Sequence, residues 1–180
     1  MSKIVVITGS PRKKGNTTAM VQAFADAAEA RGHDVVRFDA ALSNVGGCHA
    51  CETCFQSGNA CTYDDDFNTV APDILEADGL VFAAPVYWYS FPGQVKNVID
   101  KLYSFCVAEK DIAGKKAALI SCCEEDDPAV MDGLSKPFAR IADLVKWDVV
   151  GEVLVPGVLE EGAIERTDGC EQAAALAAKF

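Results

Sequence analysis

Four of the eight cysteines lie close together in the sequence. Cys48, Cys51, Cys54 and Cys61 have the spacing C-x2-C-x2-C-x6-C. Thiolates at two-residue spacing can surround one soft metal centre, because a tight turn brings every third side chain to the same side. An iron–sulfur cluster suits this spacing better than zinc, whose two-residue pairs are usually separated by a longer stretch. A thiol-rich dimer loop and a reversible disulfide are the alternatives.

A second set of polar residues lies in one short segment and could bind an anion. Residues 3–8 are β-branched and predict a strand, helical periodicity begins at Thr17, and a turn rich in Gly, Pro and Ser lies between them. Backbone N–H groups at a helix start are unpaired, so together with hydroxyls, an amide and a guanidinium they can face one phosphate. The residues of this predicted phosphate loop are Ser10, Arg12, Gly15, Asn16, Thr17 and Thr18.

This segment differs from three known phosphate loops. A P-loop has four residues between its glycines and then lysine, whereas five residues separate Gly9 from Gly15 and Asn16 follows. A dinucleotide fingerprint has glycines at its first, third and sixth positions, and a kinase glycine loop lies between antiparallel strands. The alternative is a plain helix start capped by Asn16 or Thr17. Three adjacent bases at 12–14, in a chain of net charge −11, favour a phosphate.

Length, charge and cysteine content limit the function classes. The chain has 180 residues, which predicts a single domain over 1–180, and 16 basic against 27 acidic residues. A phosphate backbone or an anionic membrane surface would be repelled, so we expect no nucleic-acid and no membrane partner. The first apolar run, residues 4–7, is too short for a signal peptide, and no stretch reaches the roughly 20 residues of a membrane span. We expect a cytoplasmic protein whose thiols are reduced, metal-bound or catalytic.

Strand-like and helix-like segments alternate along the chain. Apolar runs predict strands at 3–8, 35–38, 80–84, 117–121 and 149–155, and helical spacing predicts helices from Thr17 to about Gly32 and over 65–76, 95–106, 130–146 and 171–179. This alternation predicts an α/β fold, a parallel sheet with helices on both faces. Cys106 lies on the apolar stripe of its helix and is expected in the core. Residues 43–63 have no clear secondary structure, and so long a loop is usually functional.

Three segments together carry a family resemblance. They are the loop at 9–18, with its Gly-Ser-Pro-Arg and Gly-Asn-Thr-Thr sequences, residues 77–88 (Ala-Asp-Gly-Leu-Val-Phe-Ala-Ala-Pro-Val-Tyr-Trp) and residues 92–101 (Pro-Gly-Gln-Val-Lys-Asn-Val-Ile-Asp-Lys). Together they resemble the flavodoxin-like NAD(P)H-dependent FMN reductase family over residues 3 to about 105. The resemblance implies a flavodoxin-like, doubly wound five-stranded sheet in the order 2-1-3-4-5, FMN with its phosphate at 9–18, NAD(P)H as substrate, and a homodimer or homotetramer.

With the phosphate of FMN at 9–18, the ring would lie beyond the third and fourth strands. There Pro85, Val86, Tyr87, Trp88 and Tyr89 could bind it through backbone hydrogen bonds and an aromatic face, although core packing and a dimer patch are alternatives. Ser121 and Cys122 begin the next loop and would also contact FMN. Four acids follow at 124–127. If they lie within reach of the ring, they would disfavour an anionic reduced flavin and repel an adenosine 2′-phosphate. The alternative is that they form a solvent-exposed loop at the start of the next helix.

The resemblance implies an oxidoreductase in which the flavin carries the chemistry and no side chain acts as general acid or base. Electrons would pass from NAD(P)H or a reduced protein donor to a small-molecule or protein acceptor. The cysteine spacing, followed by three aspartates at 64–66, also resembles the iron–sulfur flavoproteins, in which a four-iron–four-sulfur cluster on the Cys48–Cys61 loop would accept electrons from ferredoxin. A non-enzymatic flavodoxin-type electron carrier that docks through its acidic surface is the third possibility.

Overall fold

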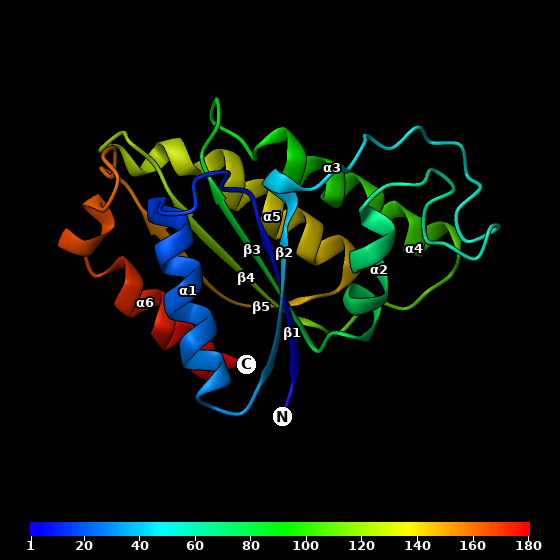
Figure 1. The fold of residues 1–180 in the computed structure, drawn as a ribbon, viewed down its shortest axis with the longest axis horizontal. Helices are drawn as coiled ribbons and strands as arrows, with labels where there is room; N and C mark the ends of the chain where they lie inside the picture. The colour runs from blue at the N-terminus through cyan, green and yellow to red at the C-terminus, as the bar shows by residue number, and fades with distance from the viewer.

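A five-stranded parallel sheet is the middle layer of the protein, whose computed structural model describes residues 1–180 (Figure 1). The strands are β1 (Lys3–Thr8), β2 (Asp34–Asp39), β3 (Gly79–Pro85), β4 (Lys116–Cys122) and β5 (Asp148–Val155). Their order is β2-β1-β3-β4-β5, and every neighbouring pair is parallel. The predicted flavodoxin-like, doubly wound α/β sheet in the order 2-1-3-4-5 is thereby confirmed.

Helices cover both faces of this sheet (Figure 1). On one face lie α1 (Asn16–Glu29) and α6 (Gly169–Leu176), and on the other α2 (Phe67–Glu76), α3 (Gly93–Lys101), α4 (Tyr103–Val107) and α5 (Asp132–Val145). Short 3-10 turns lie at Ala40–Leu42, Pro128–Met131, Ala163–Arg166 and Ala177–Lys179. Successive residues of a strand point to opposite faces, so each strand contributes to both cores. Burial on both faces explains why the strands read as continuous apolar runs.

Two of the differences between the predicted and the observed helix boundaries have a local structural reason. The helix predicted from residue 65 begins at Phe67, because Asp65 Oδ1 accepts the Phe67 N–H (3.1 Å) and so ends the preceding loop. The helix predicted over 95–106 is divided at Leu102 into α3 and α4. This turn changes the face that the second part buries, which is Ser104 and Phe105. Cys106 is exposed, so its predicted place in the core is wrong.

One long loop projects from this three-layer arrangement. No helix or strand lies between Leu42 and Phe67, in agreement with the irregular stretch predicted at 43–63. The loop extends beside α2 and α4, at the end of the molecule opposite α6 (Figure 1). None of the helices combines the length and the apolar character that crossing a membrane requires.

The parallel register aligns the carboxyl ends of four strands. Thr8 pairs with Ala83, Ala83 with Ile120, and Ile120 with Val153. The loops that follow β1, β3, β4 and β5 therefore emerge at the same edge of the sheet. In open parallel sheets this edge is where ligands bind, because loops from neighbouring strands can converge there on one molecule.

Candidate active site

A pocket of about 560 Å³ lies at this edge and is lined by all four loops. Its volume is within the roughly 300–1,000 Å³ of small-molecule sites. Most of the residues predicted to bind the cofactor line it, namely Ser10, Arg12, Gly15, Asn16, Thr17, Pro85, Val86, Tyr87, Trp88, Tyr89 and Cys122. Thr18 and Ser121 do not. Thr18 Oγ1 donates to the Arg12 carbonyl (2.8 Å) and Ser121 Oγ to the Ala84 carbonyl (2.6 Å), so both shape the loops around the pocket.

The segment after β1 turns tightly around the carbonyl oxygen of Arg12. This oxygen accepts the Gly15 N–H (3.0 Å) and the Thr18 hydroxyl, while the Ser10 hydroxyl oxygen accepts the Arg12 N–H (3.4 Å). A Cβ on Gly15 would lie 3.0 Å from both Ser10 Oγ and Arg12 Cβ, so the turn favours glycine. No side chain caps α1, and the N–H groups of its first turn are therefore available to an anion. Ser10 and Thr17, both buried, add hydroxyls beside them.

Asn16 lines the pocket, but its side chain is already engaged. Nδ2 donates to the carbonyls of Glu160 (2.8 Å) and Val158 (3.4 Å), and Oδ1 accepts the Ile164 N–H (3.3 Å). The amide therefore ties the start of α1 to the loop after β5 rather than being free for a phosphate. The N-cap residue of α1 is Gly15, so neither Asn16 nor Thr17 is the cap that the alternative interpretation required.

The residues after β3 form a two-residue hairpin that presents aromatic side chains at the pocket. The Tyr87 N–H donates to the Ser90 carbonyl (2.9 Å), and the Ser90 N–H donates to the Tyr87 carbonyl (3.0 Å). Between them Trp88 and Tyr89 have φ of +47° and +60°, the left-handed values of a type I′ turn. Such turns favour Asn-Gly, and each left-handed non-glycine residue costs of order 1–3 kcal/mol. Trp88 is 95% exposed, which excludes a place in the core.

Carboxylates form another part of the pocket rim. Of the four acids after β4, Glu124 and Glu125 line the pocket and Asp126 and Asp127 do not; Glu161 joins the first two from the loop after β5. The neighbouring Glu125 carboxylate raises the pKa of the Tyr89 phenol above its ordinary value. A rim of this charge opposes an anionic ring or an additional phosphate group in the pocket by direct Coulomb repulsion.

Two adjacent thiols complete the pocket wall. Cys122 and Cys123 are both buried, and Cys122 Sγ lies 3.2 Å from Thr17 Oγ1. Burial raises the pKa of both thiols, while the Thr17 hydrogen bond partly opposes the rise at Cys122. Both side chains are therefore neutral thiols near pH 7. They supply polarisable contact surface to the pocket and lack the thiolate character of a nucleophile.

Sequence reasoning missed the fourth loop of the pocket. Val158, Leu159 and Glu161 line it from beyond β5, and Cys123 and Val130 extend the part contributed after β4. Residues 156–162 carry no phosphate, aromatic or cysteine motif that could have indicated a site. Their position after the fifth strand of a parallel sheet is the one available signal, because all the carboxyl ends open to the same edge.

The four predicted ligand cysteines converge on a second, much smaller hollow. Cys48, Cys51, Cys54 and Cys61 all line a cavity of about 20 Å³, together with His49, Lys101 and Tyr103. Four thiols are a suitable donor set for an iron–sulfur cluster. No three Cys, His, Asp or Glu side chains are placed so that they could hold a metal ion, and a cluster would therefore require the thiols of the loop to be rearranged. The cluster therefore stays a prediction.

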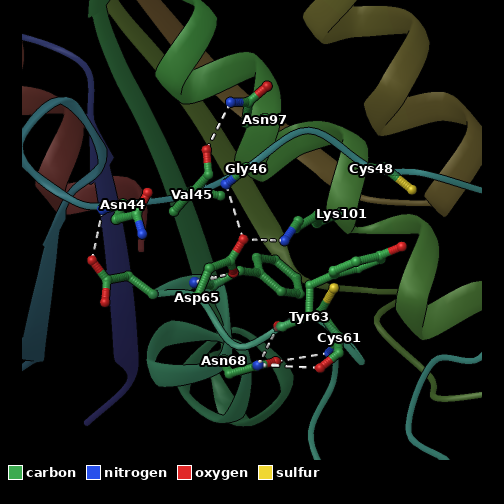
Figure 2. Close-up of polar contacts among 12 residues, drawn as sticks. Asn44, Val45, Gly46, Cys48, Cys61, Tyr63, Asp65, Asn68, Asn97 and Lys101 are labelled. Carbon is green, nitrogen blue, oxygen red and sulfur yellow. Dashed lines mark hydrogen bonds and ion pairs between the residues drawn. The ribbon is translucent and has the colours of Figure 1, made fainter.

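A buried ion pair fixes the start of the cysteine loop (Figure 2). The Asp65 carboxylate pairs with the Lys101 ammonium, and the two side chains are 8% and 2% exposed. Asp65 Oδ2 also accepts the Gly46 N–H (2.9 Å), and from α3 Asn97 Nδ2 donates to the Val45 carbonyl (2.7 Å). The chain just before Cys48 is thereby bound to α3, and the same lysine lines the cysteine hollow.

Asn68, on α2, fixes the other end of the loop (Figure 2). Its Oδ1 accepts the Cys61 N–H (2.7 Å), and its Nδ2 donates to the carbonyls of Cys61 (3.1 Å) and Tyr63 (3.0 Å). One amide thus makes three hydrogen bonds to the backbone that carries the last of the four cysteines. Within the loop, the hydroxyls of Thr53 and Thr62 are 2.8 Å apart and join its two halves.

The thiols of the cysteine loop differ in their acidity. The Thr53 hydroxyl, 3.1 Å from Cys51 Sγ, lowers the pKa of Cys51. Burial, and then the proximity of the three other thiol groups of the loop, raises the pKa of Cys54. The exposed Cys51 thiol is therefore more acidic than the less exposed Cys54 thiol. A metal ion or cluster would have to bind both as thiolates despite this difference in pKa.

The sheet order and the pocket at its carboxyl edge define a flavodoxin-like protein with a pocket where ligands bind in open parallel sheets. The model of the NADPH-dependent FMN reductase family matches residues 2–134. The chain therefore belongs to the NADPH-dependent FMN reductase family, a family of flavin oxidoreductases, as the three sequence segments predicted.

Individual proteins agree with this assignment. The chain is 34% identical over 99 residues to an iron–sulfur flavoprotein of Methanosarcina thermophila (55% of this chain, 51% of that protein). It is 32% identical over 103 residues to one of Archaeoglobus fulgidus (57% and 46%). The chain thus spans about half the length of the curated relatives it matches. The solved azoreductase of Bacillus anthracis strain Sterne has a similar fold, with a TM-score of 0.76 over 100% of both chains at 20% identity.

Proposed function

We propose that this protein is an FMN-dependent oxidoreductase that binds FMN in the 560 Å³ pocket. One observation carries the proposal: a single pocket joins the uncapped N-terminus of α1, with its buried hydroxyls, to a wall of aromatic side chains. An anion suits the first end and a flat apolar ring suits the second. Membership of the FMN reductase family supports the same cofactor.

FMN would supply hydride and single-electron transfer, and the residues of the chain bind and orient it. Arg12, Ser10 and Thr17 would hold the phosphate together with the first-turn N–H groups of α1. The hairpin of Trp88 and Tyr89 would contact the ring from the pocket wall and limit its access to water. Because the flavin would itself accept and donate the hydride, these residues position the cofactor and none of them is required as a general acid or base.

The acidic rim bears on the choice of electron donor. We infer that NADH is oxidised in preference to NADPH, because Glu124, Glu125 and Glu161 would face the additional 2′-phosphate with like charge. A reduced protein with a basic surface is the other donor that this rim would accept, and the acceptor is a small molecule or a protein. Steady-state oxidation of NADH and NADPH tests this preference; a protein faster with NADPH would contradict it.

The proposed cofactor site is tested by replacing the residues that hold the phosphate. Arg12→Ala combined with Thr17→Ala removes a guanidinium and a hydroxyl, so we expect FMN to bind at least about 100-fold more weakly, or about 2.7 kcal/mol. Lys14→Ala is the matched control, since it removes a nearby positive charge that does not line the pocket. Fluorescence titration of apoprotein with FMN gives the affinities. Equal affinity in the double variant and the control would refute the placement.

A second candidate function is favoured by the cysteine loop. Because four thiols line one hollow, we propose as the alternative an iron–sulfur flavoprotein that accepts electrons from ferredoxin through a four-iron–four-sulfur cluster at Cys48, Cys51, Cys54 and Cys61. Protein purified anaerobically should then contain about four irons per chain. Cys54→Ala should lose them, and Cys106→Ala, an exposed cysteine outside the hollow, should keep them. Wild-type protein without iron or sulfide after anaerobic reconstitution would exclude this alternative and leave the FMN proposal intact.

The same protein preparations test the third candidate function, a non-enzymatic electron carrier, and the number of subunits. A non-enzymatic carrier would bind FMN but leave NADH and NADPH unoxidised. We propose a homodimer or homotetramer, because the aromatic side chain of Trp88 is exposed at the pocket mouth, where a second subunit could cover it. Sedimentation of the holoprotein measures the subunit number, and a monomer would contradict the proposal.

A further inference from the structure

The aromatic hairpin at residues 87–90 has to be held in an unfavourable shape. Both of its central residues, Trp88 and Tyr89, are left-handed although neither is glycine. Only two backbone hydrogen bonds, both between Tyr87 and Ser90, close the hairpin internally. Strained backbone persists only where the surrounding structure restricts it. The hairpin therefore needs a support outside itself.

That support lies at the first turn of α5. A Cβ built on Gly133, the second residue of α5, would lie 1.5 Å from the Tyr89 carbonyl oxygen, 2.6 Å from the Tyr89 carbonyl carbon and 3.5 Å from Ser90 N. No side chain could occupy this place, because contacts under 3.0 Å are not tolerated by a rigid backbone. The backbone of the hairpin rests directly on the backbone of the helix.

The two partners in this contact differ in their freedom to move. Leu134, Phe138 and Ala142 bury α5 in the core between the sheet and the solvent, next to Phe82 of β3. The hairpin is exposed, since 43% of Tyr87, 95% of Trp88 and 56% of Tyr89 is accessible. A side chain added at Gly133 would therefore displace the hairpin and leave α5 in place.

We propose that Gly133 is a positioning residue of the pocket: by lacking a side chain it lets the Tyr87–Ser90 hairpin lie on α5 and keeps Trp88 and Tyr89 at the pocket wall. Gly133 does not itself line the pocket and acts through the hairpin. The proposal rests on the proposed function for its effect on FMN, but the position of the hairpin is a property of the apoprotein.

Gly133→Ala tests the proposal, with Gly93→Ala as the matched control. Both glycines lie in the first turn of a helix, and nothing lies within 4 Å of a Cβ built on Gly93. Alanine is the better helix former at both positions, so helix propensity alone would make neither variant less stable. The measurements are hydrogen exchange of the Tyr87 and Ser90 amides in the apoprotein, and the Kd for FMN.

In Gly133→Ala we expect exchange at both amides to rise at least tenfold and FMN to bind at least tenfold more weakly, with unchanged thermal unfolding. Gly93→Ala should behave as wild type in both measurements. Unchanged exchange in Gly133→Ala would overturn the proposal, and so would loss of the folded domain, because α5 rather than the hairpin would then have yielded. If wild type itself binds no FMN, the proposed function fails, and the exchange measurement alone still decides the role of Gly133.

Discussion

The pocket at the carboxyl edge of the sheet and the cysteine loop are built in different ways. Each wall of the pocket is a loop that directly follows a strand, and the ends of these loops are placed by strands and helices whose positions the sheet determines. The cysteine loop has no strand or helix from residue 43 to residue 66. It is placed by side chains of α2, α3 and the adjoining loop, mainly Asp65, Asn68, Asn97 and Lys101.

This difference predicts different sensitivities. A pocket whose loops are short and anchored in the core changes its shape only where a substitution meets one of those loops directly, as at Gly133. A loop held by a few polar side chains depends on each of them, since losing one leaves another buried polar group without a partner. Substitutions at the side chains that hold the loop should therefore alter the thiols and leave FMN binding unchanged.

The largest effect is expected at Lys101. Lys101→Met would leave the Asp65 carboxylate without its cation at a site where both side chains are over 90% buried, and breaking such a pair costs about 3–5 kcal/mol of unfolding free energy. Urea unfolding measures this cost. In the protein that remains folded, the Kd for FMN should stay within about twofold of wild type, because the pair lies away from the pocket.

Lys96→Met provides the control on the same helix. Lys96 makes an exposed i,i+4 pair with Asp100, which is worth about 0.3–0.5 kcal/mol. If Lys101→Met were no more destabilising than Lys96→Met, the buried pair would not hold the loop, and the contrast between the two regions would be lost.

A smaller effect is expected at Asn68. Asn68→Ala removes three hydrogen bonds to the Cys61–Tyr63 backbone. We expect this loss to lower the unfolding free energy by about 1–3 kcal/mol. Cys61 should react faster with a thiol reagent such as iodoacetamide, followed by mass spectrometry of its peptide, while FMN affinity is unchanged. Asn59→Ala, in the same loop and without a side-chain hydrogen bond, should react as wild type does. A weakened FMN affinity would show that the two regions are coupled.

The smallest effect is the order in which the thiols react as the pH rises. The Thr53 hydrogen bond lowers the pKa of Cys51, and burial raises the pKa of Cys122. Because iodoacetamide attacks the thiolate, we expect Cys51 to be labelled at lower pH than an ordinary thiol and Cys122 at higher pH. A Cys122 that reacts as early as Cys51 would mean that the pocket wall opens in solution.

The raised pKa of Cys122 also affects stability, with a definite sign. Above the unfolded thiol pKa of about 8.5 the unfolded chain releases this proton while the folded chain retains it, so the folded state becomes less stable as the pH rises further. Cys122→Ala should remove that part of the decline in an unfolding series between about pH 8 and 10, whereas an unchanged decline would show that other groups cause it.

Much of the pocket could be predicted because its residues carry local signals. The turn before α1 is indicated by its Gly, Ser, Pro and Arg residues. The aromatic residues are indicated as a loop at the sheet edge because they follow a strand that is apolar throughout. The engagement of the Asn16 amide with residues 158–164 could not be predicted, because its partners are more than 140 residues away. For the same reason residues 156–162 were not assigned to the pocket, and Gly133 carried no signal at all.

The cysteine loop shows the reverse relation. Its four thiols were evident from their spacing, and the structure places all four on one hollow. The spacing of the cysteines does not indicate that Asp65, Asn68 and Lys101 hold the loop in place. In the sequence each of them is an ordinary charged or polar residue in a helix or just before one. Only the fold shows that Lys101 of α3 pairs with Asp65 of the loop.

The sequence by itself determined the order of strands and helices, the parallel sheet and the family, because these depend on periodicity and on short motifs that the chain carries locally. Only the tertiary structure decided which loops share a pocket, that Cys106 is exposed, and that the hairpin of Trp88 and Tyr89 rests on Gly133. These features depend on the close packing of segments far apart in the chain, where the absence of a single carbon atom can be the deciding property of a residue.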